Sequence, residues 1–413
     1  MITGDLDRAL ATAIGSAGTW RPAPPGTACE VRTYVTTIAF WLARELADGP
    51  GAGGPAAVAA GLATRLSGLD WVEAAAVTGG GYLAVTVTAG ALARLAVRIT
   101  EAGPGCARSS ALAGTSLAAP ASADLASAQT WEEARQRVDA TVTGRLAEAA
   151  GAQVSWEYDA ERITAPHPPS PVAASPVAEG RLVKGPLVEG AVAAGPVAAG
   201  PVAAGPVAEG PVVEDAVAER RAVEGPAPAA APVAEAVAYA GADAITYALA
   251  RLLPRGPARV DARLAAAHHL GNPAYAVQYA HAHAASALRQ AADLGLGRGE
   301  AAGFQPHLLA HPSEQALLSQ LSWLPERVAG AARLGRPDVL AHFLEGLARA
   351  YFDCQEACPA VWPGMVAPDG AGRPAAERAA VQAAAARLWL AAAARTALGT
   401  GLGLLGVGAP DRL

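Results

Sequence analysis

The sequence predicts a mainly α-helical protein with a small α+β domain at its N-terminal end and a helical bundle at its C-terminal end. Three patterns lead to this prediction. Apolar residues recur at helical spacing through residues 234–413, alternating runs flank Gly79-Gly80-Gly81, and a five-residue repeat separates the two regions. The chain has 413 residues, so two to three domains of ordinary size are expected.

Residues 1–100 carry the signals of the α+β domain. Residues 34–47 repeat apolar side chains every three or four positions, which predicts a helix, and a second helix is expected over 55–68. Residues 71–76 and 82–88 lie on either side of the three glycines. They predict two strands, because apolar residues alternate along the second segment.

The middle of the chain carries few signals of regular structure. Residues 101–170 are poorly defined except for one helix at about 131–150. Residues 171–233 hold a PVAAG-type repeat, in which Pro removes an amide donor every fifth residue and Gly permits a turn. This low-complexity pattern predicts a long disordered linker; a regular repeat spiral or a partner-binding tract is the alternative.

Residues 234–413 are helical in pattern throughout, and Gly and Pro divide them into segments. Ser313 follows Pro312 and is a candidate N-cap. Frequent Ala allows helix axes to approach closely, so an antiparallel bundle is the expected architecture. The expected helices span residues 234–253, 273–294, 313–334, 337–357 and 375–399.

Composition limits the partners. The net charge is −6, and the C-terminal region 236–413 is only mildly basic, with 15 Arg against 13 acidic residues and seven of the eight His. Because phosphate neutralisation supplies most nucleic-acid affinity, this balance argues against tight, nonspecific RNA binding. Four Cys rule out a disulfide framework, the N-terminus has no apolar signal region, and the run 388–394 meets Arg395 before a membrane span is complete. We therefore expect a soluble cytoplasmic protein with neither a membrane nor DNA among its partners.

Four blocks in the C-terminal third resemble the arginyl-tRNA synthetase family. Residues 272–290, NPAYAVQYAHAHAASALRQ, resemble the NPxYxVQYAHAR helix that opens the family's DALR-type anticodon-binding domain. GADAITYAL (241–249), HPSEQALL (311–318) and the closing segment 387–413 match further blocks in the same order. The resemblance covers nearly all of 236–413 and implies a helical domain that contacts tRNA.

The first 100 residues resemble, more weakly, the family's other appended domain, which contacts the tRNA elbow at the D-loop. Residues 34–39 (YVTTIA) stand where a YATNVA-like helix start is usual, and residues 77–84 (VTGGGYLA) where VAGPGFIN is usual. Tyr82 is the tRNA-binding candidate here, in place of Phe. Ala84 replaces the Asn of the D-loop motif and so removes a base-reading amide.

The motifs that charge tRNA in this family are missing. A class I synthetase active site needs an HxGH motif and a KMSKS-type loop, which neutralise the phosphates of ATP. Residues 1–166 contain no His, no two His are three positions apart, and Lys184 is the only lysine. His268-His269 directly precedes NPAY and is interpreted as a helix-terminal loop. We expect no catalytic domain, no catalytic residue and no cofactor.

The resemblance implies tRNA-binding residues on the helix of residues 273–290. Tyr275, Gln278 and Tyr279 share a face by their spacing, so a tyrosine would stack on an unpaired anticodon base while the amide reads a base edge. The alternative is that the tyrosines anchor the bundle core.

The other candidates come from the same helix and from the end of the chain. His281 and Arg289 match the family, whereas His283 replaces an Arg and loses its permanent charge and bidentate donor. The last helix would present a positive face to phosphates, or else a solvated Arg face with one core Trp; the final residue stands where the family has Met. These candidates are Arg387, Trp389, Arg395 and Leu413.

Cys354 and Cys358, with His342 twelve residues before the first, suggest a metal site. Two further ligands are not evident, so buried free thiols are the preferred interpretation and no metal is predicted.

Two functions remain open. The favoured one is a non-catalytic relative of the synthetase that binds tRNA weakly, with arginine tRNA as the leading candidate, in a regulatory or accessory role. The alternative is a protein-interaction module that no longer binds RNA; arginine ligation would require a separate catalytic chain.

Overall fold

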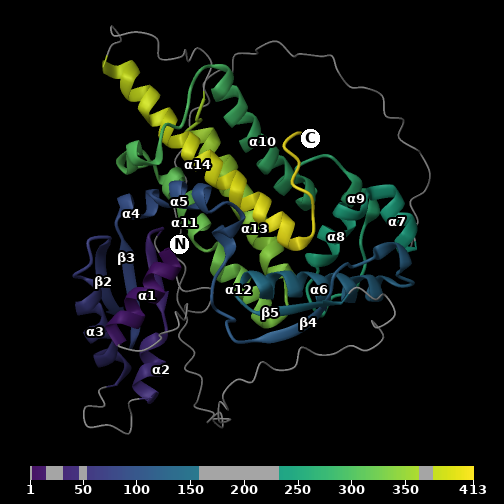
Figure 1. The fold of residues 1–413 in the computed structure, drawn as a ribbon, viewed down its shortest axis with the longest axis horizontal. Helices are drawn as coiled ribbons and strands as arrows, with labels where there is room; N and C mark the ends of the chain where they lie inside the picture. The colour runs from purple at the N-terminus through teal and green to yellow at the C-terminus, as the bar shows by residue number, and fades with distance from the viewer. Residues whose placement is uncertain (1, 15–30, 46–53, 158–231, 362–374) are drawn as a thin grey trace, which may run out of the picture.

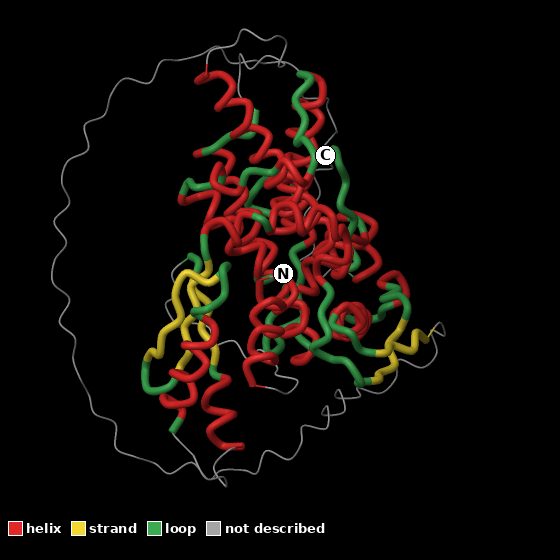
Figure 2. The backbone as a smooth tube through the Cα atoms, turned by 60° about the vertical axis from the view of Figure 1, so that its left-hand side comes forward, coloured by secondary structure: helices red, strands yellow, loops and turns green. Residues whose placement is uncertain are grey.

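A computed structural model describes residues 2–14, 31–45, 54–157, 232–361 and 375–413. The PVAAG repeat lies outside the described residues. Within them, helices dominate, and the strands form two small sheets at separate places, as Figure 2 shows in yellow. The predicted fold class, mainly helical with a small N-terminal α+β region, is confirmed.

The N-terminal region is a three-stranded antiparallel sheet in the order β1-β3-β2, with α3 packed on it and α1 and α2 on α3. A hairpin joins β2 and β3 through Gly79, Gly80 and Gly81, whose φ angles of 48°, 80° and 139° explain why the turn uses glycine. The elements are α1 (Ile2–Ile14), β1 (Thr33–Thr36), α2 (Ile38–Glu45), α3 (Pro55–Leu66), β2 (Val72–Thr78) and β3 (Tyr82–Val87).

The predicted helix over 34–47 is wrong at its start. Tyr34 and Val35 belong to β1, and the helix α2 begins at Ile38. β-branched and aromatic residues favour a strand here, and β1 finds a partner in β3. The hydroxyl of buried Tyr34 lies 2.7 Å from that of Ser322, so this strand is also tied to the C-terminal helices.

A second unit follows, in which α6 (Trp131–Ala149) connects two parallel strands, β4 (Ser116–Pro120) and β5 (Gln153–Glu157). The helix predicted over 131–150 is confirmed. Gly144 allows α6 to lie against both strands, because a Cβ there would come within 2.9 Å of the Trp156 ring and closer still to Ala119. Two short helices, α4 (Ala89–Ala93) and α5 (Leu95–Ala102), and the 3-10 turns η1 (Gly103–Ala107) and η2 (Leu125–Ser127) complete this part.

The C-terminal region is helical, as predicted. Its longest helix, α14, crosses the molecule diagonally and packs against α10, α13 and α5 (Figure 1). Short 3-10 turns, η4 (Ala301–Gly303) and η5 (Pro306–Leu308), join α10 to α11. The helices are α7 (Val233–Ala240), α8 (Ala242–Ala250), α9 (Ala262–Ala266), α10 (Pro273–Asp293), α11 (Pro312–Ser322), α12 (Leu324–Leu334), α13 (Pro337–Ala357) and α14 (Ala375–Leu405).

Three helix boundaries differ from the prediction. The segment 234–253 breaks at Gly241, whose φ is 87°, and the segment 313–334 breaks at Trp323. The last helix continues to Leu405. The cap of α11 also differs: His311, not Ser313, accepts the backbone bond, and Glu314 completes a capping box.

Length and composition would let Glu377–Leu405 of α14 cross a membrane, but 67% of its most apolar window is buried inside the protein. A mostly buried core helix passes the same test. One continuous cluster of buried side chains runs from Leu6 in α1 to Leu402 in α14. The N-terminal sheet, the β4–α6–β5 unit and the C-terminal helices therefore share a core.

Candidate nucleic-acid interface

Helix α10 is positioned by its N-cap. The Asn272 side chain accepts a hydrogen bond from the amide of Ala274 and donates to the carbonyls of Ala265 and Ala267 at 2.9 and 2.8 Å. Only 4% of Asn272 is exposed. The loop between α9 and α10, which carries His268, is thereby fixed against the first turn of α10.

Half-exposed aromatic side chains line one face of α10. The Tyr275 and Tyr279 rings stack with centroids 5.7 Å apart and planes 10° apart. His268 stacks on Tyr275 at 5.5 Å, and Phe352 on Tyr279 at 5.7 Å. The stack therefore continues in both directions, from the α9–α10 loop to α13, and it is partly open to solvent.

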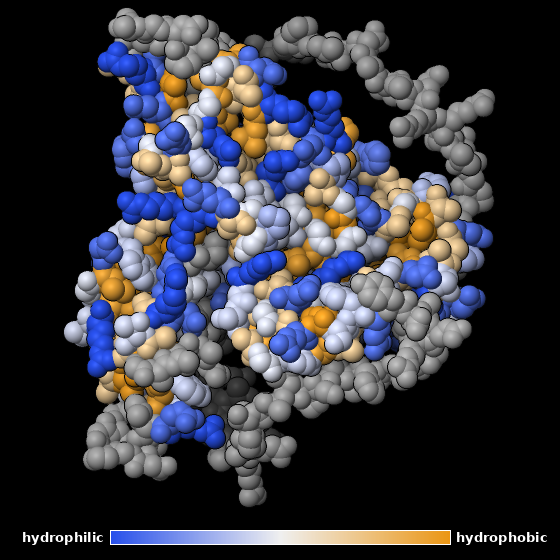
Figure 3. Space-filling model, in the orientation of Figure 1, coloured by the Kyte–Doolittle hydropathy of each residue, from blue (hydrophilic) through white to orange (hydrophobic). Residues whose placement is uncertain are grey.

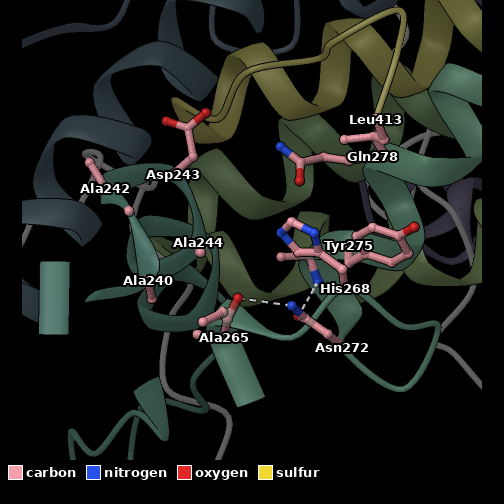
Figure 4. Close-up of a pocket in the computed structure, with 13 residues that line it drawn as sticks. Ala240, Ala242, Asp243, Ala244, Ala265, His268, Asn272, Tyr275, Gln278 and Leu413 are labelled. Atoms are coloured by element: carbon pink, nitrogen blue, oxygen red, sulfur yellow. Dashed lines mark hydrogen bonds between the residues drawn. The ribbon is translucent and has the colours of Figure 1, made fainter. Parts of the chain in front are cut away.

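A pocket of about 280 Å³ lies beside this stack (Figure 4). We call it the tail pocket, because the last residue of the chain forms part of its wall. His268 and Tyr275 lie next to each other on one side of the view, with Gln278 and Leu413 beside them, while Ala240 and Asp243 lie on the opposite side. The structure thus brings three predicted residues, Tyr275, Gln278 and Leu413, to one place.

Five side chains hold the C-terminal segment 406–413, which we call the tail, against the helices. Gln278 Nε2 donates to the carbonyl of Gly408 at 2.9 Å, and the amide of Gly408 donates to Asp243 at 2.7 Å. His281 Nδ1 donates to the carbonyl of Pro410 at 3.1 Å.

Two arginines hold the next residue of the segment. Arg289 donates to the carbonyl of Asp411 at 3.1 Å, and Arg395 pairs with the Asp411 carboxylate at 2.8 Å. The polar side chains predicted to read RNA are therefore bonded to the chain's own end in this conformation.

His283 faces the interior side of the aromatic cluster. Its Nδ1 forms a 2.9 Å hydrogen bond with the hydroxyl of Tyr351, which is fully buried. Burial lowers the pKa of His283 and, in the same way, that of His281, so both imidazoles favour the neutral form. Neither histidine replaces the permanent charge of an arginine at neutral pH.

Two predicted residues of α14 are turned inward. Trp389 is 6% exposed, and its Nε1 donates to the carbonyl of Arg298 at 2.9 Å. Arg387 pairs at 2.8 Å with Glu314, whose side chain is 1% exposed. Of the alternative interpretation of this helix, the core Trp fits the structure, whereas Arg387 does not lie on a solvated face, and neither side chain lines the tail pocket.

Tyr82 lies in the N-terminal sheet, apart from the residues of α10. It begins β3, and its ring packs edge-to-face on Phe40 with centroids 5.0 Å apart. The structure does not bring it together with the other candidates.

The cysteines form no cluster with His342. Cys354 and Cys358 are free and buried, and His342 Nδ1 bonds the carbonyl of Asp338 at 2.8 Å. Among the described residues, no group of three or more His, Cys, Asp and Glu side chains is arranged to hold a metal ion.

Sequence reasoning missed three contributors to the site. His268 was assigned to a loop, which is correct, but its stacking on Tyr275 follows only from the fold of that loop. Phe352 comes from α13 and Asp243 from α8, and nothing in the local sequence links either to α10.

Comparison with known proteins finds a family match over part of the chain. The DALR anticodon binding domain matches residues 277–413. The arginine–tRNA ligase of Micrococcus luteus is 41% identical over 177 residues, and that of Paenarthrobacter aurescens is 38% identical over 177 residues. Each match covers 43% of this chain and 30% of the ligase. This chain thus matches less than a third of the length of these relatives.

A solved structure agrees at the level of the fold. The arginyl-tRNA synthetase of Thermus thermophilus superposes with a TM-score of 0.57 at 17% identity, and the match covers 100% of both chains. Residues 277–413 therefore match the DALR anticodon binding domain, and the C-terminal region is homologous to arginine–tRNA ligases.

Proposed function

We propose that this chain binds tRNA through the tail pocket and the aromatic stack of α10, and that it does not charge the tRNA. The observation that carries the proposal is the half-exposed stack of His268, Tyr275 and Tyr279 beside a pocket closed by Leu413. Aromatic faces stack on unpaired bases, and Gln278 supplies an amide at the pocket edge. The match to arginine–tRNA ligases makes arginine tRNA the first RNA to test.

The affinity should be weak. The chain has a net charge of −6, so attraction to phosphates over the whole surface is absent. His283 replaces an arginine, and Gln278, His281, Arg289 and Arg395 must release or share their bonds with the tail before they contact RNA.

The absence of catalysis is supported by the β4–α6–β5 unit. In parallel α/β sheets, nucleotides bind beyond the carboxyl ends of the strands, where a helix N-terminus attracts phosphate. Here the N-terminus of α6 is capped by Thr130 and carries Glu132 and Glu133 in its first turn. These carboxylates repel phosphate, and the sequence lacks an HxGH motif and the lysines of a KMSKS-type loop. We propose a regulatory or accessory role in the cytoplasm.

The experiment is a fluorescence-anisotropy titration of labelled arginine tRNA with the full chain at about 50 mM salt, a concentration at which phosphate contacts are strong. Saturable binding that favours arginine tRNA over a tRNA of another specificity supports the proposal. No binding at tens of micromolar rejects it. ATP–pyrophosphate exchange with arginine should stay at background, and a measurable exchange rate would overturn the non-catalytic part.

A second function is favoured by one observation, the occupation of the polar groups by residues 406–413. If the tail does not move, the same surface serves a protein partner instead. On the face in Figure 3, hydrophilic side chains separate small hydrophobic spots, so such an interface would be polar. Nuclease-resistant recovery of a defined protein partner, together with failure of the tRNA titration, would favour this function.

A further inference from the structure

The structure has a second groove, larger than the tail pocket. It has a volume of about 860 Å³ and runs between the segment 103–109, the C-terminal part of α6 and the last turns of α14. We call it the arginine groove. Its polar lining includes Arg108, Ser109, Arg145, Glu148, His281 and Arg395.

Arg145 is the central feature of the groove. It projects from α6 and is half-buried, yet it makes no hydrogen bond or ion pair with any residue that the structure describes. Its guanidinium lies against Gly406 at the end of α14, where a Cβ would collide with it. The carbonyls of that helix end partly offset its charge. A half-dehydrated guanidinium with no carboxylate partner still favours an anionic ligand.

The neighbouring groups add to this preference. Arg108 is exposed, and its side chain likewise makes no hydrogen bond or ion pair with a described residue. The Ser109 hydroxyl is buried and has no hydrogen-bond partner in the described structure. Arg395 already shares its charge with Asp411, and Glu148 is exposed on the groove wall. The lining of the groove therefore holds two guanidiniums and one hydroxyl without a side-chain partner, but only one carboxylate.

Helix α10 contributes a side chain to both the groove and the tail pocket. Gln278 lines the tail pocket and His281, one helical turn later, lines the groove. The tail is hydrogen-bonded to both residues, to Gln278 at Gly408 and to His281 at Pro410. An RNA strand with a base in the tail pocket would therefore place its neighbouring backbone toward the arginines.

We infer that the arginine groove binds a backbone phosphate of the RNA that occupies the tail pocket, with Arg108 and Arg145 as the charged contacts and Ser109 as a hydrogen-bond donor. This inference rests on the proposed function. Arginine presents a planar pair of donors that fits a phosphate, whereas a hydroxyl alone adds no charge.

The experiment compares the salt dependence of arginine-tRNA binding for the unmodified full chain and for four variants of it. Arg108→Gln and Arg145→Gln should each weaken binding about 3- to 10-fold at low salt and reduce the slope of log affinity against log salt by about 0.7 to 0.9. Arg333→Gln, at an exposed arginine in α12 outside the groove, should change neither. Arg145→Lys, which keeps the charge, should restore most of the slope.

Fold integrity and the source of the phosphate are tested separately. Arg108 is exposed, so Arg108→Gln remains informative if Arg145→Gln unfolds. If the wild type binds tRNA and neither Gln variant changes the slope, the inference is wrong while the proposed function stands. Titration with inorganic tripolyphosphate covers the other case. If the wild type binds tripolyphosphate but not tRNA, and Arg145→Gln abolishes that binding, the groove takes a free phosphate and the RNA assignment is overturned. If it binds neither, both proposals fail.

Discussion

Arg395 holds Asp411 through both carboxylate oxygens, with its Nη2 atom 2.8 Å from one and 2.9 Å from the other. The hydrogen bonds from Arg395 lower the pKa of Asp411, so the pair stays charged well below neutral pH. About half of each side chain is exposed, and such pairs contribute little to stability, about 0–1 kcal/mol. The pair matters instead because it fixes the position of the tail, whose last residue, Leu413, forms part of the wall of the tail pocket.

Substituting either member of this pair tests whether tRNA binding depends on the position of the tail or on the charge near the RNA site. Asp411→Asn removes a negative charge near the RNA site, and Arg395→Gln removes a positive one, yet both release the tail. If the position of Leu413 matters, both variants weaken tRNA binding, with the larger loss for Arg395→Gln. If charge alone matters, Asp411→Asn tightens binding instead. Anisotropy titrations measure the binding, and thermal melts should show little change for Asp411→Asn.

Two substitutions of Tyr275 distinguish stacking of its ring on an RNA base from hydrogen bonding by its hydroxyl. Tyr275→Ala should weaken tRNA binding by the value of one base–aromatic stack, about 1–3 kcal/mol, which is roughly 5- to 150-fold. Tyr275→Phe keeps the ring and should bind within about 2-fold of the wild type, because the stack with His268 and Tyr279 needs only the aromatic face. Equal losses in both variants would contradict a stacking role and point to the hydroxyl.

Most helices of this protein could be predicted from local patterns, and the reasons are physical. α10 and α13 begin with Pro in their first turn and keep helical spacing for 21 residues each. The two helix breaks that the apolar spacing did not predict also lie at residues that favour a helix boundary. Gly241 adopts a positive φ between α7 and α8, and Pro325 lies in the first turn of α12. α1 was not predicted, although Ile2, Leu6 and Leu10 repeat every four residues and are buried.

The site could be predicted only in part. The spacing of Tyr275, Gln278 and Tyr279 gave their common face, because it depends on one helix. The tail contacts join residues that are distant in sequence, such as Asp243 and Gly408 or Arg289 and Asp411. Periodicity carries no information on such pairs, so the self-occupied state of the site follows only from the three-dimensional structure.

Glu314 should be the most sensitive charged residue for stability. Its side chain accepts a bond from Arg387 at 2.8 Å and another from the His311 amide at 3.0 Å, which closes the capping box of α11. Glu314→Gln leaves a mostly buried arginine without its carboxylate and should cost about 3 kcal/mol or more. Urea unfolding measures the loss. Asp411→Asn is the matched control, since it breaks an exposed pair and should cost less than about 1 kcal/mol.

The lowered pKa values of His281 and His283 predict how stability depends on pH. Burial lowers the pKa of His281 and His283 in the folded state below the ordinary value of 6.5. Below pH 6.5 the unfolded chain therefore binds protons that the folded chain rejects, and these two residues reduce stability as the pH falls. Above that pH both states are neutral and the residues contribute no pH dependence.

Asp139 acts in the opposite direction, so the wild type alone does not isolate the histidines. Burial raises the pKa of Asp139 to about 6, which makes its contribution to stability decrease as pH rises from about 4 to about 6. The double variant His281→Asn, His283→Asn keeps a side-chain amide donor at both positions and cannot titrate. Between pH 7.5 and 5.5 the melting temperature of the wild type should fall by a few degrees more than that of the double variant, at about 2–4 °C per kcal/mol. An equal fall in the melting temperature of both proteins across this range would contradict the prediction, because it would show that the histidines take up protons as readily in the folded state as in the unfolded state.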